Sequence, residues 1–258
     1  MASRPVFLPP ARPSELLSYI ISRESFPTTL IICSPKAEFL ASLISDARPQ
    51  QEQEDHERGQ ENAEQLDQQA AASPQQPPEA AQQLLQAPLS QVAIARHIRM
   101  VFIPTVSHLR AFLSVFAPAD SKVPPPPAQT DVQGEASRPR GQSPLLLVYG
   151  FLELHRHTSE WSAQGLGHTA AGLVEAARLH SFQPVIVEPK TEGSLASDTV
   201  LGEQVPLLSG TTLRIGPDVE GGGWSGRTVE AKRVLGRWFR FEDRQWAKDQ
   251  DKASNDVE

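Results

Sequence analysis

The sequence has one cysteine, no long apolar run and no excess of positive charge. Cys33 has no second thiol to pair with, so an internal disulfide is excluded and a reducing compartment is favoured. No stretch approaches the roughly 20 apolar residues that span a bilayer, and we therefore expect no membrane anchor. The net charge of −7 gives the whole molecule no attraction to nucleic acid, so any such contact would need a local basic patch.

Apolar residues are scarce in three tracts. Residues 49–90 are rich in Gln, Glu, Ala and Pro, and we expect a disordered insertion there. Residues 118–143 include consecutive prolines and are expected to form a stiff, solvated linker. Residues 244–258 are predicted to be a solvated acidic tail. What remains suits one compact domain, built from residues 1–48, 91–117 and 144–243.

Short apolar runs alternate with segments of helical periodicity. The predicted strands are Thr28–Cys33, Ile98–Ile103, Leu145–Val148 and Val185–Val187. The predicted helices are Ser14–Arg23, Glu38–Ala47, Val106–Phe116 and Gly167–His180. This alternation predicts an α/β fold with a mostly parallel central sheet covered by helices on both faces. Two further predicted strands, Val205–Ile215 and Thr228–Phe241, are expected to extend the sheet at one edge in antiparallel orientation.

The turn that follows the first predicted strand lacks the features of a phosphate-binding loop. Such a loop needs glycines whose backbone N–H groups approach the phosphates. Ser34–Ala37 contains no glycine, and Pro35 removes one N–H group. Lys36 could be a relic of the loop lysine, although an exposed lysine at a helix start is the simpler interpretation. Tyr149 follows the strand Leu145–Val148, where an ATPase would present an aspartate to Mg²⁺.

The remaining ionisable groups do not form a catalytic set. Glu188 ends an apolar run and could be a base, but a lone carboxylate there is more often solvated or paired. Cys33 has no basic neighbour in sequence to lower its pKa, and no serine lies in a Gly-x-Ser-x-Gly elbow. Four histidines are expected at the surface rather than around a metal: His155, His157, His168 and His180. We therefore expect no enzyme activity, no cofactor and no metal ion.

The strand Leu145–Val148 is followed by Arg156 and then by the sequence Glu160-Trp161-Ser162-Ala163-Gln164-Gly165. This pattern resembles eukaryotic RecA-type recombinases and their paralogues, in which a short helix ending in Arg precedes an acidic residue, an aromatic, Ser and a Gly-containing helix start. The resemblance implies a RecA-like P-loop NTPase fold. It also implies that Lys36, Tyr149 and Glu188 occupy degenerate nucleotide-site positions.

The resemblance further implies a function without catalysis. Degenerate RecA-like chains are subunits of recombinase-paralogue assemblies such as the Shu complex, which assists homologous recombination and DNA repair. We expect a nuclear hetero-oligomer with another RecA-like protein, and contact with DNA is open. The alternative is the RecA-like ring of Elongator, which acts in tRNA modification.

Two sets of residues are candidates for binding. Basic side chains interleaved with an aromatic ring are typical of single-strand binders, and this set contains Arg227, Lys232, Arg233, Arg237, Trp238 and Arg240. Its ordinary explanation is a strand with solvated arginines on one face. Three residues would suit a partner interface if they are exposed: Arg156, Trp161 and Trp224. Burial in the core is the alternative for the two tryptophans.

Overall fold

A computed structural model gives the fold of the chain. It describes residues 4–23, 25–47, 89–124, 143–190, 198–208, 213–214, 223–224 and 227–243. The disorder predicted for most of the glutamine-rich insertion and of the proline-rich linker lies outside the described residues. So does the whole predicted acidic tail.

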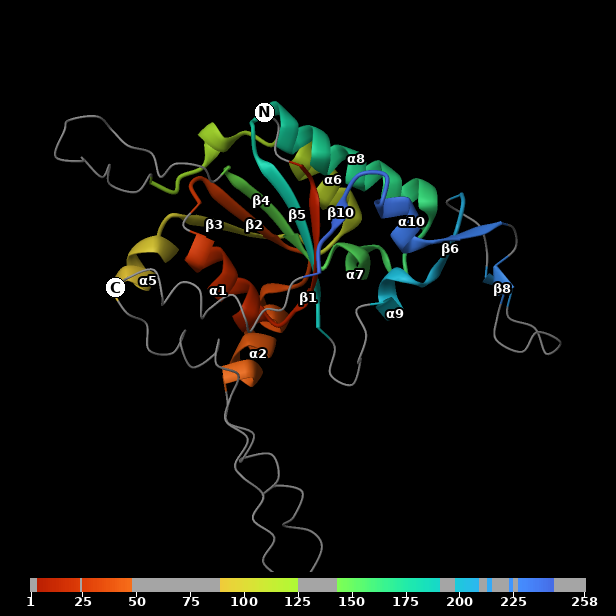
Figure 1. The fold of residues 1–258 in the computed structure, drawn as a ribbon, viewed down its shortest axis with the longest axis horizontal. Coiled ribbons are helices and arrows are strands. Elements are labelled where there is room, and N and C mark those ends of the chain that lie inside the picture. Colours follow the sequence, from red (N-terminus) through yellow and green to blue (C-terminus); the bar gives the residue numbers. More distant parts are fainter. Residues whose placement is uncertain are drawn as a thin grey trace, which may run out of the picture.

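A six-stranded sheet forms the centre of the molecule (Figure 1), and every pair of neighbouring strands in it is parallel. Its strands are β1 (Val6–Ala11), β2 (Thr28–Ile32), β3 (Ile98–Phe102), β4 (Leu145–Tyr149), β5 (Gln183–Pro189) and β10 (Arg240–Phe241). They lie in the order β10-β1-β5-β4-β2-β3. The α/β class and the parallel sheet predicted from the alternation of elements are confirmed.

Helices cover both faces of the sheet. On one face lie α1 (Pro13–Arg23) and α2 (Lys36–Ala47), and on the other lie α6 (Val106–Ser114), α8 (Ala163–Leu179) and α10 (Ala231–Leu235) (Figure 1). The described residues also form three short helices: α5 (Leu89–Ala95), α7 (Phe151–His155) and α9 (Asp198–Leu201). A 3₁₀ turn, Pro118–Asp120, follows α6.

The core consists of two apolar layers that the sheet separates. Alternate side chains of β4 point to opposite faces, so Leu146 and Val148 join the layer under α6 and α8. Leu145 and Leu147 join the layer under α1 and α2. Both layers are buried, which explains why β4 is a continuous apolar run instead of an alternating one.

The strand β1 lies inside the sheet between β5 and β10, although its sequence contains Pro9 and Pro10. Sequence analysis did not predict it, because proline cannot donate to a ladder. The structure accommodates both prolines. The ladder with β5 shifts register between Leu8 and Ala11, and β10 pairs only with Val6 and Phe7.

The prediction of antiparallel edge strands was wrong. The edge strand β10 runs parallel to β1. The antiparallel pairs are separate two-stranded sheets, one of β6 (Gln204–Pro206) with β9 (Thr228–Glu230) and one of β7 (Leu213–Arg214) with β8 (Gly223–Trp224).

The predicted strand Thr228–Phe241 is also not continuous. The helix α10 interrupts it, since Ala231, Val234 and Leu235 have the spacing of one helical face and are buried against α8 and its neighbours.

Candidate functional site

The edge of the sheet where the parallel strands end is the first place to look for a site. In open α/β sheets, ligands bind where the loops of neighbouring strands leave toward opposite faces. Here β1 leads to α1 on one face, while the next described element after its neighbour β5 is α9, whose Leu201 lies in the apolar layer of the other face. The same divergence separates β2, which leads to α2, from β4, which leads to α7 and then to α8. The ends of β1, β5, β4 and β2 therefore define the candidate site.

The turn between β1 and α1 has its N–H groups occupied by carboxylates of the chain. The backbone N–H of Arg12 donates to Glu15 Oε2 at 2.8 Å, which is one half of a capping box. The N–H and the hydroxyl of Ser14 both donate to Asp46 Oδ2, at 3.3 and 3.1 Å. Pro13 has no N–H group. The positive end of α1, where an anion such as phosphate would bind, thus already faces two negative side chains.

Tyr149 ends β4 beside this turn and is 5% exposed. Its hydroxyl donates to the carbonyl oxygen of Ala11, the last residue of β1, at 2.9 Å. Its ring meets the Phe39 ring edge-on, with the centroids 6.0 Å apart. Burial raises the pKa of Tyr149, so the phenol remains neutral. The end of β4 therefore holds an uncharged ring that packs between two strands and α2.

Glu188 differs from the expectation of a solvated or ion-paired carboxylate. It is 3% exposed, and its oxygens accept hydrogen bonds from the backbone N–H groups of Leu152 at 2.8 Å and Glu153 at 3.4 Å. Burial raises the pKa of Glu188 to about 8, although the two N–H groups act in the opposite direction. The carboxyl group joins β5 to the first turn of α7.

Gly150 connects β4 to α7 with a backbone φ of 84°, which side chains other than glycine rarely adopt. Cys33 lies beside it and is buried, as its apolar surroundings in the sequence predicted. Burial raises the pKa of the Cys33 thiol well above its usual value, which keeps it protonated.

Lys36 is the first residue of α2 and is exposed, as the simpler interpretation of its sequence position predicted. From the sequence, only the turn after β2 could be compared with a phosphate loop. The structure shows that the turn after β1 also lies at the candidate site, and neither β1 nor this turn was predicted. Its signal in the sequence is a helix start in which Glu15 stands three residues after Arg12, the spacing of a capping box.

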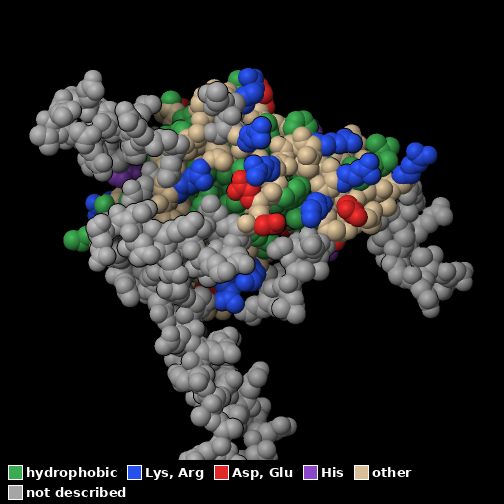
Figure 2. All heavy atoms as spheres, viewed as in Figure 1, with side chains coloured by type: hydrophobic (Ala, Val, Ile, Leu, Met, Phe, Trp, Pro, Cys, Tyr) green, Lys and Arg blue, Asp and Glu red, His purple; other side chains and the backbone are tan. Residues whose placement is uncertain are grey.

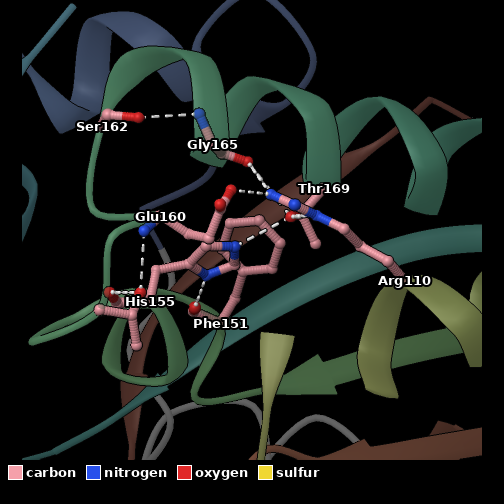
Figure 3. A network of polar contacts seen from close by, with 8 residues as sticks. Arg110, Phe151, His155, Glu160, Ser162, Gly165 and Thr169 are labelled. Carbon is pink, nitrogen blue, oxygen red and sulfur yellow. Dashed lines mark hydrogen bonds and ion pairs between the residues drawn. The ribbon is translucent and has the colours of Figure 1, made fainter. Parts of the chain in front are cut away.

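A second polar cluster surrounds Arg110 on the opposite face of the sheet (Figure 3). Arg110 extends from α6 and donates to Glu160 Oε2 at 2.6 Å, to the Gly165 carbonyl oxygen at 3.0 Å and to the Thr169 hydroxyl at 2.9 Å. One arginine thereby joins α6 to the loop before α8 and to the first two turns of α8.

The prediction that His155 lies at the surface was wrong, because this side chain is fully buried. Its Nδ1 lies 2.7 Å from the carbonyl oxygen of Phe151, so Nδ1 donates. Its Nε2 lies 2.9 Å from the Thr169 hydroxyl. Burial lowers the pKa of His155 to about 4, and the ring is neutral at physiological pH. His157 and His168 are exposed, as predicted.

The segment Glu160–Gly165 leads into the start of α8 in this cluster (Figure 3). The Ser162 hydroxyl accepts the N–H of Gly165 at 3.0 Å and caps the helix. A Cβ atom at Gly165 would lie 2.2 Å from the carbonyl oxygen of Glu160, so only glycine fits. Ser162, Gly165 and Glu160 therefore each have a structural role inside this chain.

The residues proposed for a partner interface make contacts within the chain. Arg156 forms ion pairs with Glu203 and, at 3.7 Å, with Glu153. Its guanidinium lies 5.8 Å from the Trp161 ring centroid. Trp161 is 8% exposed and therefore buried, which is the alternative to an exposed interface residue that the sequence left open. The backbone of Trp224 pairs with Leu213, and its side chain lies outside the described part of the chain.

The six residues proposed for nucleic-acid binding are all exposed. They lie just before β9, on α10, on the turn after it and on β10, and not along one strand as the ordinary explanation assumed. They are Arg227, Lys232, Arg233, Arg237, Trp238 and Arg240.

Within the described ranges, no group of three or more His, Cys, Asp and Glu side chains could hold a metal ion. In the same ranges, no helix combines the length and apolar character that crossing a membrane requires. The fold defines the class as an α/β protein with a six-stranded parallel sheet. A scan against protein-family models and a search of curated proteins find no match to the chain.

Proposed function

We propose that this chain is a non-catalytic RecA-like subunit of a recombinase-paralogue complex of the Shu type, which assists homologous recombination and DNA repair in the nucleus. The observation that carries the proposal is the way the chain fills its own candidate site. Glu15 and Asp46 accept the N–H groups of the turn after β1, and Tyr149 occupies the end of β4.

An anionic ligand would meet an unfavourable site. A triphosphate at the start of α1 would have to displace two carboxylates from their hydrogen bonds and would then lie close to their charges. Like charges at such distances repel one another. Buried, neutral Tyr149 supplies no negative oxygen for Mg²⁺.

A thermal-shift assay tests the absence of nucleotide binding. A ligand at 100 times its Kd stabilises a protein by about 2.7 kcal/mol, which for a domain of this size raises Tm by roughly 5–10 °C. We expect no shift with millimolar Mg-ATP or Mg-ADP. A shift of that size, lost in Arg12→Ala or Lys36→Ala, would overturn the proposal.

Affinity purification of the full chain from its native cells tests the assembly. We expect RecA-like recombinase paralogues to co-purify with it, and mass spectrometry identifies them. Recovery of Elongator subunits instead would assign the chain to the tRNA-modifying ring and refute the repair function.

A further inference from the structure

We propose that the surface of α10 and β10 binds single-stranded nucleic acid. The surface consists of Lys232, Arg233, Arg237, Trp238 and Arg240, and is called here the α10–β10 surface. The inference goes beyond the proposed function, because a non-catalytic subunit could act through protein contacts alone.

The charge of this surface differs from that of the whole chain. Residues 231–241 contain four Lys and Arg residues and no Asp or Glu, whereas the chain has a net charge of −7. The acidic residues of the segment lie at its ends, with Glu230 before α10 and Glu242 and Asp243 after β10. Figure 2 shows Lys and Arg side chains over the part of this face where α8 and α10 lie, with acidic side chains among them.

The packing of α10 directs these cations outward. Ala231, Val234 and Leu235 are buried on the side of α10 that packs against α8. The intervening residues Lys232 and Arg233 are therefore exposed.

The turn after α10 is held in place by its backbone. The N–H groups of Trp238 and Phe239 both donate to the Leu235 carbonyl oxygen at 2.9 Å, and Phe239 is buried. The N–H of Arg240 donates to the Pro5 carbonyl oxygen at 3.0 Å beside β1. The side chains of Arg237, Trp238 and Arg240 thus project from a fixed backbone.

The arginines of this surface differ from three arginines elsewhere in the protein. Arg110, Arg156 and Arg178 each form an ion pair with a glutamate. Among the described residues, Arg233, Arg237 and Arg240 form no ion pair. Unpaired, exposed arginines are free to neutralise phosphates and to release their counterions.

The exposed side chain of Trp238 favours single-stranded over double-stranded nucleic acid as the ligand. It is 39% exposed on a molecule whose other described tryptophan side chain, Trp161, is buried. An exposed indole next to arginines offers a face on which an unpaired base stacks, and stacking of this kind is the usual means of single-strand binding. A duplex hides its base faces and would gain nothing from Trp238.

Fluorescence anisotropy of the full chain with a labelled oligo(dT) of about 20 nucleotides, longer than the usual site, tests the inference. Single-strand affinity falls with salt by a slope of about 0.7 per phosphate contact. We expect Arg237→Ala with Arg240→Ala to weaken binding at least tenfold and to reduce that slope by about 1.4. Trp238→Ala is expected to weaken binding about 5- to 100-fold with an unchanged slope.

The matched control is Arg96→Ala with Arg178→Ala, which removes two exposed arginines outside the α10–β10 surface, one in the turn after α5 and one on α8. This control changes the net charge equally and should retain the affinity of the wild type within a factor of two or so. Arg237→Lys with Arg240→Lys keeps the charge and should retain most of the salt slope. Circular dichroism checks that every variant is folded.

Three results would overturn the inference: no binding of oligo(dT) by the wild type at low salt, equal losses in the surface variant and the control, or tighter binding of a duplex than of the single strand. A variant that binds oligo(dT) normally but loses a co-purifying protein would identify the surface as a protein interface instead. None of these results bears on the nucleotide assay, so the test of nucleotide binding in the proposed function is independent of them.

Discussion

Gly165 lies where the loop after α7 enters α8, and its replacement by alanine tests the packing of this junction. The new Cβ atom would lie 2.2 Å from the carbonyl oxygen of Glu160 and 2.9 Å from its carbonyl carbon and Cα. All three atoms belong to the backbone, so no side-chain rotation relieves the contact. Backbone must move back by about 0.8 Å before the oxygen reaches the 3.0 Å limit for real Cβ contacts.

This movement would also disturb the groups that Arg110 joins, because its guanidinium bonds both the Glu160 carboxylate and the Gly165 carbonyl oxygen. Overpacking of this kind costs about 1–3 kcal/mol. Weakened hydrogen bonds to Arg110 add about 1 kcal/mol to the destabilisation. The higher helix propensity of alanine offsets up to about 1 kcal/mol of it. We expect Gly165→Ala to lower the free energy of unfolding by about 1–4 kcal/mol and Tm by roughly 2–16 °C.

Gly172→Ala in the same helix is the matched control. A Cβ atom at Gly172 meets nothing within 4 Å. This variant should gain about 0.5–1 kcal/mol, because alanine loses less conformational entropy than glycine on folding. Urea unfolding followed by circular dichroism measures both variants. The packing argument is refuted if Gly165→Ala is as stable as the wild type, or if the two variants change stability equally.

Three further predictions follow from buried polar groups. Tyr149→Phe loses the hydrogen bond to the Ala11 carbonyl oxygen and should destabilise the fold by about 1 kcal/mol in urea titrations. The pKa of Glu188 is raised to about 8, so its contribution to stability is full below its unfolded pKa of about 4.3 and is lost as pH rises through 8. Stability should therefore fall between about pH 4.3 and 8 in the wild type but not in Glu188→Gln, and a parallel decline in both would contradict this. The pKa of His155 is lowered to about 4, so its contribution to stability is full above about pH 6.5 and is lost as pH falls through 4. Urea unfolding at pH 4 and pH 7 should therefore show a smaller loss of stability in His155→Gln than in the wild type.

Much of the fold could be predicted from local patterns, because apolar periodicity reports which faces of an element are buried. The apolar run of β4 and the stripe of Leu109 and Leu113 on α6 each correspond to an observed element. The two failures in the sheet have physical reasons. The prolines of β1 conceal a strand, and the helical spacing of Val234 and Leu235 lies inside a segment of alternating polarity.

The candidate site was less predictable than the fold, because its contacts join residues far apart in sequence. Nothing near Ser14 indicates that Asp46 accepts its N–H, and nothing near Glu188 indicates that α7 begins against its carboxylate. The burial of His155 likewise depends on Thr169 in another helix.

The sequence by itself determined the α/β class, the positions of most helices and strands, and the absence of a glycine-rich phosphate loop after β2. These properties follow from residue type and short-range spacing, which act within one or two turns of chain. Tertiary structure alone decided the strand order, the occupation of the α1 turn by carboxylates, the burial of Glu188 and His155, and the common exposure of Arg237, Trp238 and Arg240. Each of these depends on which elements pack together, since burial and hydrogen-bond partners come from chain that is distant in sequence.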